Sequence, residues 1–267
     1  MAVLVCTVPV SPMRREAAHR SEMVSQLLFG ECALILEEEG DFVKVCGAYD
    51  GYEGWCQRSQ LRAISDEIPP STTLYSNDYC AEVMLQGQRM FLPFGSPIYG
   101  AEQNAKLFGE GSLDNKNFSQ NAIQSAQGFT PERLQDASLR FLNTSYLWGG
   151  KSVFGIDCSG FSQQVFKLMG IPLLRDAYQQ AEQGEAVTDL ASSSTGDLLF
   201  FDNEAGRITH VGILLHPQEI IHASGRVRID KIGADGIYNE EGRKTHRLHS
   251  IRRVQYEDRN TSDGTGL

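Results

Sequence analysis

The chain has 267 residues, of which 41% are hydrophobic and 22% are charged. This is a globular composition, and it argues against disordered, collagen-like and coiled-coil proteins. The net charge of −10 argues against general nucleic-acid binding, because phosphate backbones attract basic surfaces. No segment approaches the ~18 consecutive apolar residues of a membrane span, so we expect no membrane span.

The amino-terminal segment carries a short apolar run that Pro9 and Pro12 interrupt, and its charges follow that run. A secretory signal has its positive charges before the apolar run. We therefore expect a cytoplasmic protein. A chain from which a signal had already been removed would look the same, and it would be periplasmic or secreted.

Two β-rich regions come first. Residues 1–65 contain short apolar runs bounded by Gly, Asp and Asn, which predict a small β-barrel. Residues 66–123 repeat this texture and predict a second small barrel. Residues 124–267 differ, because two amphipathic helices, over 131–142 and 158–169, precede four strand-like runs at 196–203, 210–216, 219–225 and 246–256. Helices followed by a block of strands favour an α+β fold.

The cysteines separate into two groups. Five lie within the first 80 residues among apolar neighbours, and we expect them to be small buried hydrophobes. No CxxC or paired Cys/His spacing occurs, so we expect no metal site. Cys158 stands alone after Asp157 at the start of the second predicted helix. The positive end of a helix dipole favours a thiolate, so Cys158 is the candidate nucleophile.

A nucleophilic cysteine needs a base and a group that orients the base. His210 opens one predicted strand and His222 ends the next, so antiparallel pairing would bring their rings together. From spacing alone, ordinary hydrogen-bonding histidines remain an alternative. We expect the other histidines of this region to lie in loops or on the surface: His216, His246 and His249.

Four motifs of this half occur in a characteristic order: YLWGGKSVFGIDCSGF, GDLLFF, ITHVGILL and IIHASG. Together they resemble the NlpC/p60 family of papain-like cysteine peptidases over residues 125–255. The resemblance implies a papain-like fold and thiol-dependent hydrolysis without a cofactor. It also implies that Cys158 is the nucleophile, His210 the base and His222 the orienting residue.

The amino-terminal segment, over residues 8–61, resembles the bacterial SH3-like (SH3b) domain that precedes such peptidases. It is most similar to the γ-D-glutamyl-L-diamino acid endopeptidases that trim murein peptides. The resemblance implies that this domain borders the active site, where Glu22 and Tyr52 help to bind the free amine of L-Ala. Alternatively, Glu22 lies on a solvated face and Tyr52 packs beside Trp55.

Further site residues follow from the same resemblance. It suggests substrate contacts by Asp157, Ser159 and Asp176. Trp148 would wall the pocket, and the Tyr146 hydroxyl would donate to the oxyanion beside the backbone N–H of Cys158. The alternatives are a surface ion pair between Asp176 and Arg175, and plain core packing of Trp148.

We therefore expect an α+β protein with a papain-like NlpC/p60 domain over 124–267, preceded by SH3-like barrels over 1–65 and 66–123. The expected reaction is hydrolysis of the γ-D-Glu–L-diamino acid bond in murein peptides with a free N-terminal L-Ala. The alternatives are a wall-binding hydrolase of intact peptidoglycan, a papain-like acyltransferase and a non-catalytic scaffold. The expected partner is the murein-derived peptide, with no nucleic acid involved.

Overall fold

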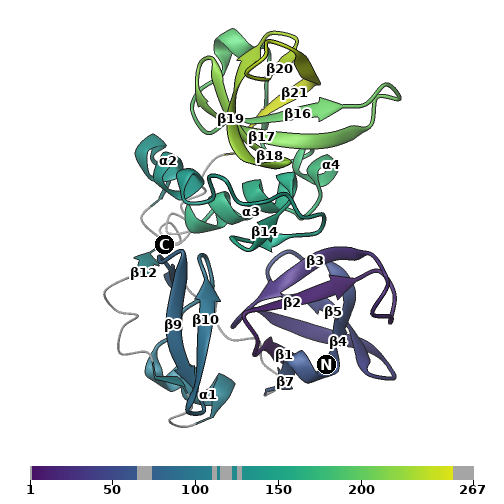
Figure 1. Ribbon diagram of the computed structural model, residues 1–267, viewed down its shortest axis with the longest axis vertical. Coiled ribbons are helices and arrows are strands. Elements are labelled where there is room, and N and C mark those ends of the chain that lie inside the picture. The colour runs from purple at the N-terminus through teal and green to yellow at the C-terminus, as the bar shows by residue number, and fades with distance from the viewer. Residues whose placement is uncertain (1, 65–73, 110–112, 115–121, 125–127, 255–267) are drawn as a thin grey trace, which may run out of the picture.

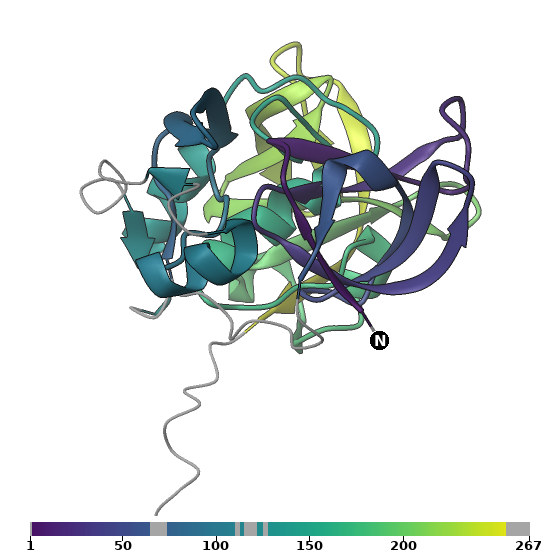
Figure 2. The same cartoon turned by 90° about the horizontal axis from the view of Figure 1, so that it is seen from below.

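The computed structural model describes residues 2–64, 74–109, 113–114, 122–124 and 128–254. The chain builds three units (Figure 1). Two β-rich amino-terminal units lie side by side, and a layer of helices separates them from the carboxyl-terminal sheet. Figure 2, seen from below, shows the two amino-terminal units next to each other, in front of the rest of the molecule.

The first unit is a seven-stranded antiparallel sheet curled into a small barrel, in the order β3-β2-β6-β5-β4-β1-β7. A single 3₁₀ turn, η1 (Arg58–Gln60), precedes its last strand. The strands are β1 (Val3–Cys6), β2 (Val10–Arg14), β3 (Met23–Leu28), β4 (Cys32–Glu39), β5 (Phe42–Gly47), β6 (Glu53–Gln57) and β7 (Leu61–Ala63).

Strand β1 is buried on both faces. Its alternate residues Leu4 and Cys6 pack inside the first barrel. Val3 and Val5 point the other way and pack with residues of the second unit, among them Val83. Because successive side chains of a strand point to opposite faces, this fully apolar strand joins the cores of both amino-terminal units.

The second unit has two small sheets, β10-β9-β11 and β12-β8, and one helix. Its elements are β8 (Leu74–Ser76), β9 (Cys80–Leu85), β10 (Gln88–Pro93), α1 (Ala101–Phe108), β11 (Leu113–Asp114) and β12 (Ala122–Gln124). The predicted boundary after residue 65 lies outside the described residues, and the one after 123 falls within β12. Both boundaries stay predictions.

The third unit begins with helices and a small hairpin: α2 (Pro131–Leu139), β13 (Lys151–Ser152), β14 (Gly155–Ile156), α3 (Cys158–Leu168) and α4 (Ala177–Gln180). The remainder is β15 (Glu185–Val187), η4 (Leu190–Ser192), β16 (Leu198–Asp202), β17 (Ile208–His216), β18 (Glu219–Ser224), β19 (Arg226–Gly233), β20 (Gly236–Tyr238) and β21 (Lys244–Arg253). Strand β21 pairs with both β16 and β20, so six strands close into a ring and β15 extends it. No helix in the described part of the chain has the length and apolar character needed to span a bilayer.

Helix α3 is buried along its whole length, although it contains both apolar and polar residues. Phe161 and Val165 pack against the sheet, with Val211 of β17 in the same core. The opposite face of the helix presents Gln163 and Lys167 to the first barrel. The helix therefore lies between the two units, with Cys158 as its first residue.

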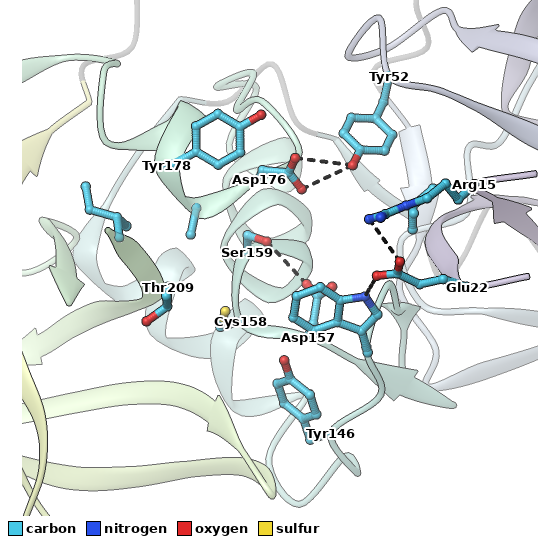
Figure 3. A pocket seen from close by; sticks show the side chains of 14 residues that line it. Arg15, Glu22, Tyr52, Tyr146, Asp157, Cys158, Ser159, Asp176, Tyr178 and Thr209 are labelled. Atoms are coloured by element: carbon cyan, nitrogen blue, oxygen red, sulfur yellow. Dashed lines mark hydrogen bonds and ion pairs between the residues drawn. The ribbon is translucent and has the colours of Figure 1, made fainter. Parts of the chain in front are cut away.

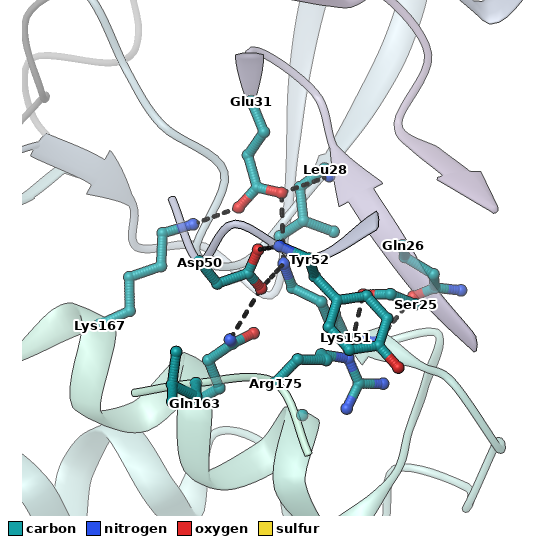
Figure 4. Close-up of polar contacts among 12 residues, drawn as sticks. Ser25, Gln26, Leu28, Glu31, Asp50, Tyr52, Lys151, Gln163, Lys167 and Arg175 are labelled. Carbon is teal, nitrogen blue, oxygen red and sulfur yellow. Dashed lines mark hydrogen bonds and ion pairs between the residues drawn. The ribbon is translucent and has the colours of Figure 1, made fainter. Parts of the chain in front are cut away.

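Buried charges join the first barrel to the third unit (Figure 4). The Nζ of Lys167 lies 2.6 Å from Glu31 of the barrel, and Lys151 lies 3.5 Å from the same carboxylate. Gln163 donates to Asp50 at 3.0 Å. Each of the three ion-paired side chains is less than 10% exposed, so the two units form one continuous interior at this junction.

Candidate active site

Cys158 lies at the junction of α3 and β17. The Asp157 carboxylate caps α3 by accepting from the N–H of Gly160 at 2.7 Å. The backbone N–H of Val211 donates toward the Cys158 sulfur. Since Val211 follows His210, the nucleophile sits beside the strand segment that carries its expected base.

A chain of hydrogen-bonded side chains runs away from this point across three adjacent strands. The Nε2 of His210 on β17 lies 2.8 Å from Nδ1 of His222 on β18, and Nε2 of His222 lies 3.1 Å from Asp230 on β19. Gly212 stands opposite His222 in the ladder, and a Cβ there would lie 3.0 Å from the Cβ of His222 and closer still to Ile220. Glycine at this position therefore leaves room for His222.

Burial sets the protonation of the pair. Burial and the Asp157 charge raise the pKa of the Cys158 thiol to about 12, despite the N–H groups directed at the sulfur. Burial and the neighbouring His222 hold the pKa of His210 well below 6.5. The resting site therefore holds a neutral thiol and a neutral imidazole, whereas the helix dipole alone favours a thiolate.

Arg175 is a site residue that the sequence did not indicate. It is 1% exposed, and its guanidinium binds the Asp157 carboxylate at 2.6 and 3.1 Å. It also donates to Ser159 and, across the domain boundary, to Ser25. The alternative of a surface ion pair between Arg175 and Asp176 is therefore wrong. Only the rule that a buried arginine requires a carboxylate could have suggested that Arg175 binds Asp157.

The cavity beside Cys158 has a volume of about 350 Å³ and is formed by both the first barrel and the third unit (Figure 3). All seven residues expected to contact substrate line it, together with Cys158, whereas His210 and His222 are not among the lining residues. Those seven are Glu22, Tyr52, Tyr146, Trp148, Asp157, Ser159 and Asp176.

Two polar contacts cross the cavity wall between units. The Trp148 indole N–H donates to Glu22 at 2.7 Å, and Arg15 lies 2.9 Å from the same carboxylate. The Tyr52 hydroxyl donates to Asp176 at 3.2 Å. Trp148 is 60% exposed, so plain core packing is excluded. Glu22 and Tyr52 likewise face the cavity rather than a purely solvated or apolar setting.

Tyr146 stands on the Cys158 side of the cavity, with its hydroxyl directed toward the cavity (Figure 3). Burial and the neighbouring Cys158 raise the pKa of its hydroxyl. It therefore keeps its proton, as a donor to an oxyanion must. This role, like the substrate contacts expected of Asp157 and Ser159, stays a prediction.

His246 is a correction to the sequence analysis, which expected it in a loop or on the surface. It belongs to β21, and its ring stacks on His210 with centroids 4.2 Å apart. His210, His222 and His246 each offer a nitrogen within 4.8 Å of the others, as a metal site would. The rings of His210 and His246 are nearly parallel, at 24°, so their in-plane lone pairs do not converge on one ion. The hydrogen bond between His210 and His222 and the stacking of His246 on His210 account for the cluster better.

Comparisons with known proteins identify related families and related chains. Residues 143–258 match the NlpC/P60 family, and residues 13–61 match the bacterial dipeptidyl-peptidase Sh3 domain. A γ-D-glutamyl-L-lysine dipeptidyl-peptidase of Bacillus subtilis is 33% identical over 74% of this chain and 71% of its own. A protein of the same name from Bacillus cereus is 26% identical over 76% and 68%.

Among solved structures, a crystal structure of an NlpC/P60 family protein from Bacillus cereus superposes with a TM-score of 0.76. The alignment covers 95% of this chain and 100% of that one, at 21% identity, so it shows that the fold is shared. The B. subtilis relative, which aligns over 74% of this chain, supplies the sequence evidence. The chain belongs to the NlpC/P60 family of cysteine peptidases.

Proposed function

We propose that the protein hydrolyses the γ-D-Glu–L-diamino acid bond of murein peptides that carry a free N-terminal L-Ala. The observation that carries this proposal is the shared cavity, in which Cys158 faces carboxylates held by the first barrel and by the α4 start. Relatives named γ-D-glutamyl-L-lysine dipeptidyl-peptidase support the same bond.

An ammonium group is the complement to this wall. Glu22 and Asp176 both line the cavity, and burial raises the pKa of Asp176, so an arriving cation would stabilise its charged form. A buried ammonium is tolerated when it is paired and hydrogen-bonded. A site of this kind accepts a free amine and rejects a capped one.

The size of the cavity supports a short acyl segment. About 350 Å³ lies at the small end of the ~300–1,000 Å³ range of small-molecule sites. Tyr52 and Glu22 close the side opposite Cys158 (Figure 3). A dipeptide that ends at this wall fits the arrangement better than a peptide continuing into a glycan strand.

The reaction follows from the neutral resting pair. His210 takes the proton of the Cys158 thiol as the sulfur attacks the amide carbonyl, and the resulting imidazolium protonates the leaving amine as the C–N bond breaks. His210 then takes a proton from water, which attacks the thioester and releases the dipeptide. The imidazolium returns its proton to the sulfur.

The test is incubation with L-Ala-γ-D-Glu-L-Lys and with the corresponding diaminopimelate peptide, followed by mass analysis. We expect L-Ala-D-Glu and the free diamino acid, and no products from the N-acetylated peptide. Cys158→Ala should abolish turnover, whereas Cys46→Ala, at a half-buried thiol outside the cavity, should not. Equal cleavage of acetylated peptide or of intact peptidoglycan would favour a wall hydrolase, and transfer to an added amine would favour an acyltransferase.

A further inference from the structure

Asp230 is the last residue in the series of hydrogen-bonded side chains that runs from His210 through His222. Its side chain is 2% exposed, and Oδ2 lies 3.1 Å from Nε2 of His222 and 2.8 Å from the Arg228 guanidinium. Burial opposes its charge, but the hydrogen bond from His222 and the neighbouring Arg228 outweigh it and lower the pKa of Asp230. The group is therefore an ionised carboxylate, which can only accept hydrogen bonds.

The ionised Asp230 determines which atom donates and which accepts in each hydrogen bond between Asp230, His222 and His210. Because Asp230 only accepts, Nε2 of His222 carries the proton. A neutral His222 then has a bare Nδ1, which accepts from the partner 2.8 Å away. Nε2 of His210 must carry that proton, so the bare nitrogen of the neutral His210 ring is Nδ1.

We propose that Asp230 is a positioning residue that fixes the tautomers of both histidines and so keeps Nδ1 of His210 ready to accept the Cys158 proton. The proposal deepens the function proposed above and rests on it for its catalytic meaning. Asp230 does not line the cavity, so it acts through His222 and His210 rather than on the substrate.

The opposite polarity is the state that Asp230 excludes. With Nε2 of His222 bare, its lone pair would face the carboxylate, Nδ1–H would donate to His210, and Nδ1 of His210 would carry the remaining proton. That imidazole cannot take a proton from the thiol. Removing the Asp230 acceptor removes the energetic cost of this inactive arrangement of tautomers. In catalytic triads, a wrong histidine tautomer is a known cause of a large loss of kcat.

Two substitutions separate hydrogen-bond polarity from charge. Asp230→Ala removes the acceptor, and we expect kcat to fall about 10- to 100-fold, as for other orienting partners, with KM unchanged. Asp230→Asn keeps an acceptor, because its amide oxygen will face the two donors, Arg228 and His222. We expect Asp230→Asn to restore most of kcat.

Asp197→Ala is the matched control. Asp197 is also 2% exposed and paired with an arginine, Arg253, at 2.8 Å in the same sheet, but no hydrogen bond links it to a histidine among the described residues. Its loss should lower stability while leaving kcat near the wild-type value. An Asp230→Ala enzyme with wild-type kcat, or an equal loss in both alanine variants, would overturn the proposal.

Imidazole ¹⁵N chemical shifts provide a readout that needs no turnover, because protonated and bare ring nitrogens have different shifts. In wild-type protein we expect bare Nδ1 and protonated Nε2 on both His210 and His222. In Asp230→Ala, a fraction of His210 should carry its proton on Nδ1. A protonated Nδ1 on wild-type His210 would refute the inference even if Asp230→Ala failed to fold. If wild-type protein cleaved none of the peptides, the proposed function would fail while the spectrum still decided the tautomers.

Discussion

The Cys158 thiol is buried among groups that oppose its ionisation, and His210, its expected base, is buried among groups that oppose protonation. Asp157 stands directly before the nucleophile, yet Arg175 and two backbone N–H groups bind its carboxylate. Burial, with the remaining field of Asp157, still raises the thiol pKa to about 12. In the proposed mechanism, proton transfer to His210 therefore accompanies attack on the substrate instead of preceding it.

This electrostatic state predicts the pH dependence of alkylation. Because the folded thiol pKa is raised and that of His210 is lowered, the thiolate fraction should grow about tenfold per pH unit through the neutral range. Iodoacetamide inactivation, followed by residual activity, should accelerate steadily from pH 6 to pH 9. A rate that is level across this range would instead indicate a preformed thiolate–imidazolium pair.

The same experiment needs a correction for other thiols. Cys6, Cys32 and Cys56 are buried as expected, but Cys46 and Cys80 are only partly buried. Cys158→Ala protein treated in parallel measures their contribution by mass. Labelling assigned to Cys158 is the difference between the two proteins.

The amine site predicts a second effect of single residues. Asp176→Asn and Glu22→Gln each remove a charge from the cavity wall, and we expect kcat/KM for the free-amine tripeptide to fall on the order of 10²-fold. The ratio of free to acetylated substrate should shrink as well. Glu53→Gln, which alters an exposed ion pair elsewhere on the first barrel, is the control. Unchanged discrimination in both cavity variants would contradict an ammonium site.

The sequence motifs indicated the residues expected to react, but not the residues that hold them. Cys158, His210 and His222 occur in motifs with a fixed order. Arg175 and Asp230 carry no such signal, because a buried ion pair 18 residues apart, or an acceptor on the next strand, depends on packing. Alternation in RVRIDKIG favours a strand at best, and its charges resemble a surface segment.

At the scale of elements, the sequence predicted helices and strands well where their ends carry recognisable signals. Thr130 and Pro131 begin α2, and Asp157 caps α3 close to the expected limits. The four strand-like runs became β16, β17, β18 and β21. β19 and β20 were not predicted, and with them the closure of the six-stranded ring, since the charges of β19 resemble a surface segment and β20 has only three residues.

The loop after Trp148 depends on one glycine. Gly149 has φ of +76°, and a Cβ there would lie 2.5 Å from the Met23 carbonyl of the first barrel. Gly149→Ala should therefore displace the loop, weaken the contact between Trp148 and Glu22, and lower both melting temperature and kcat/KM. We expect a destabilisation of about 1–3 kcal/mol.

Gly242→Ala isolates the cause. Gly242 has φ of +72°, and no atom lies within 4 Å of the position that an alanine Cβ would take, so only backbone strain changes. Thermal unfolding of the two variants should show the larger loss for Gly149→Ala. Equal losses, with catalysis intact in both, would mean that the approach to Met23 is unimportant.

At the scale of the whole molecule, the junction between the first barrel and α3 predicts acid sensitivity. Burial opposes the charge of Glu31, but Lys151 and Lys167 outweigh it and lower its pKa to about 2. A depressed folded pKa contributes stability above the unfolded value near 4.5, and this contribution is lost as pH falls toward 2. The melting temperature should decline across that window.

Glu31→Gln tests the source of that decline. The substitution removes the carboxylate that pairs with Lys167 and leaves Lys151 only Asp50 at 4.0 Å, so we expect a loss of about 3–5 kcal/mol at pH 7 and a flatter acid limb. Glu53→Gln, in the exposed pair with Lys44, should leave both nearly unchanged. An acid limb as steep in Glu31→Gln as in wild type would show that other carboxylates control it.

The sequence predicted the α+β class and the order of β-rich and peptidase regions, and the cytoplasmic location stays a prediction. It could not predict how the regions meet. Glu31 and Lys167 are 136 positions apart, and each resembles a surface charge when taken alone. Only the folded junction makes them a buried pair.

Because two units form the cavity, the order in which they are synthesised determines how the cavity assembles. Glu22 and Tyr52 belong to a barrel that is complete before the ribosome reaches Cys158. At about 5–20 residues per second, the intervening stretch takes about 5–20 s to synthesise, and domains fold as units in that order. The nascent α3 therefore docks on a finished wall. Cys158 therefore lies next to the barrel side of the cavity as soon as α3 forms.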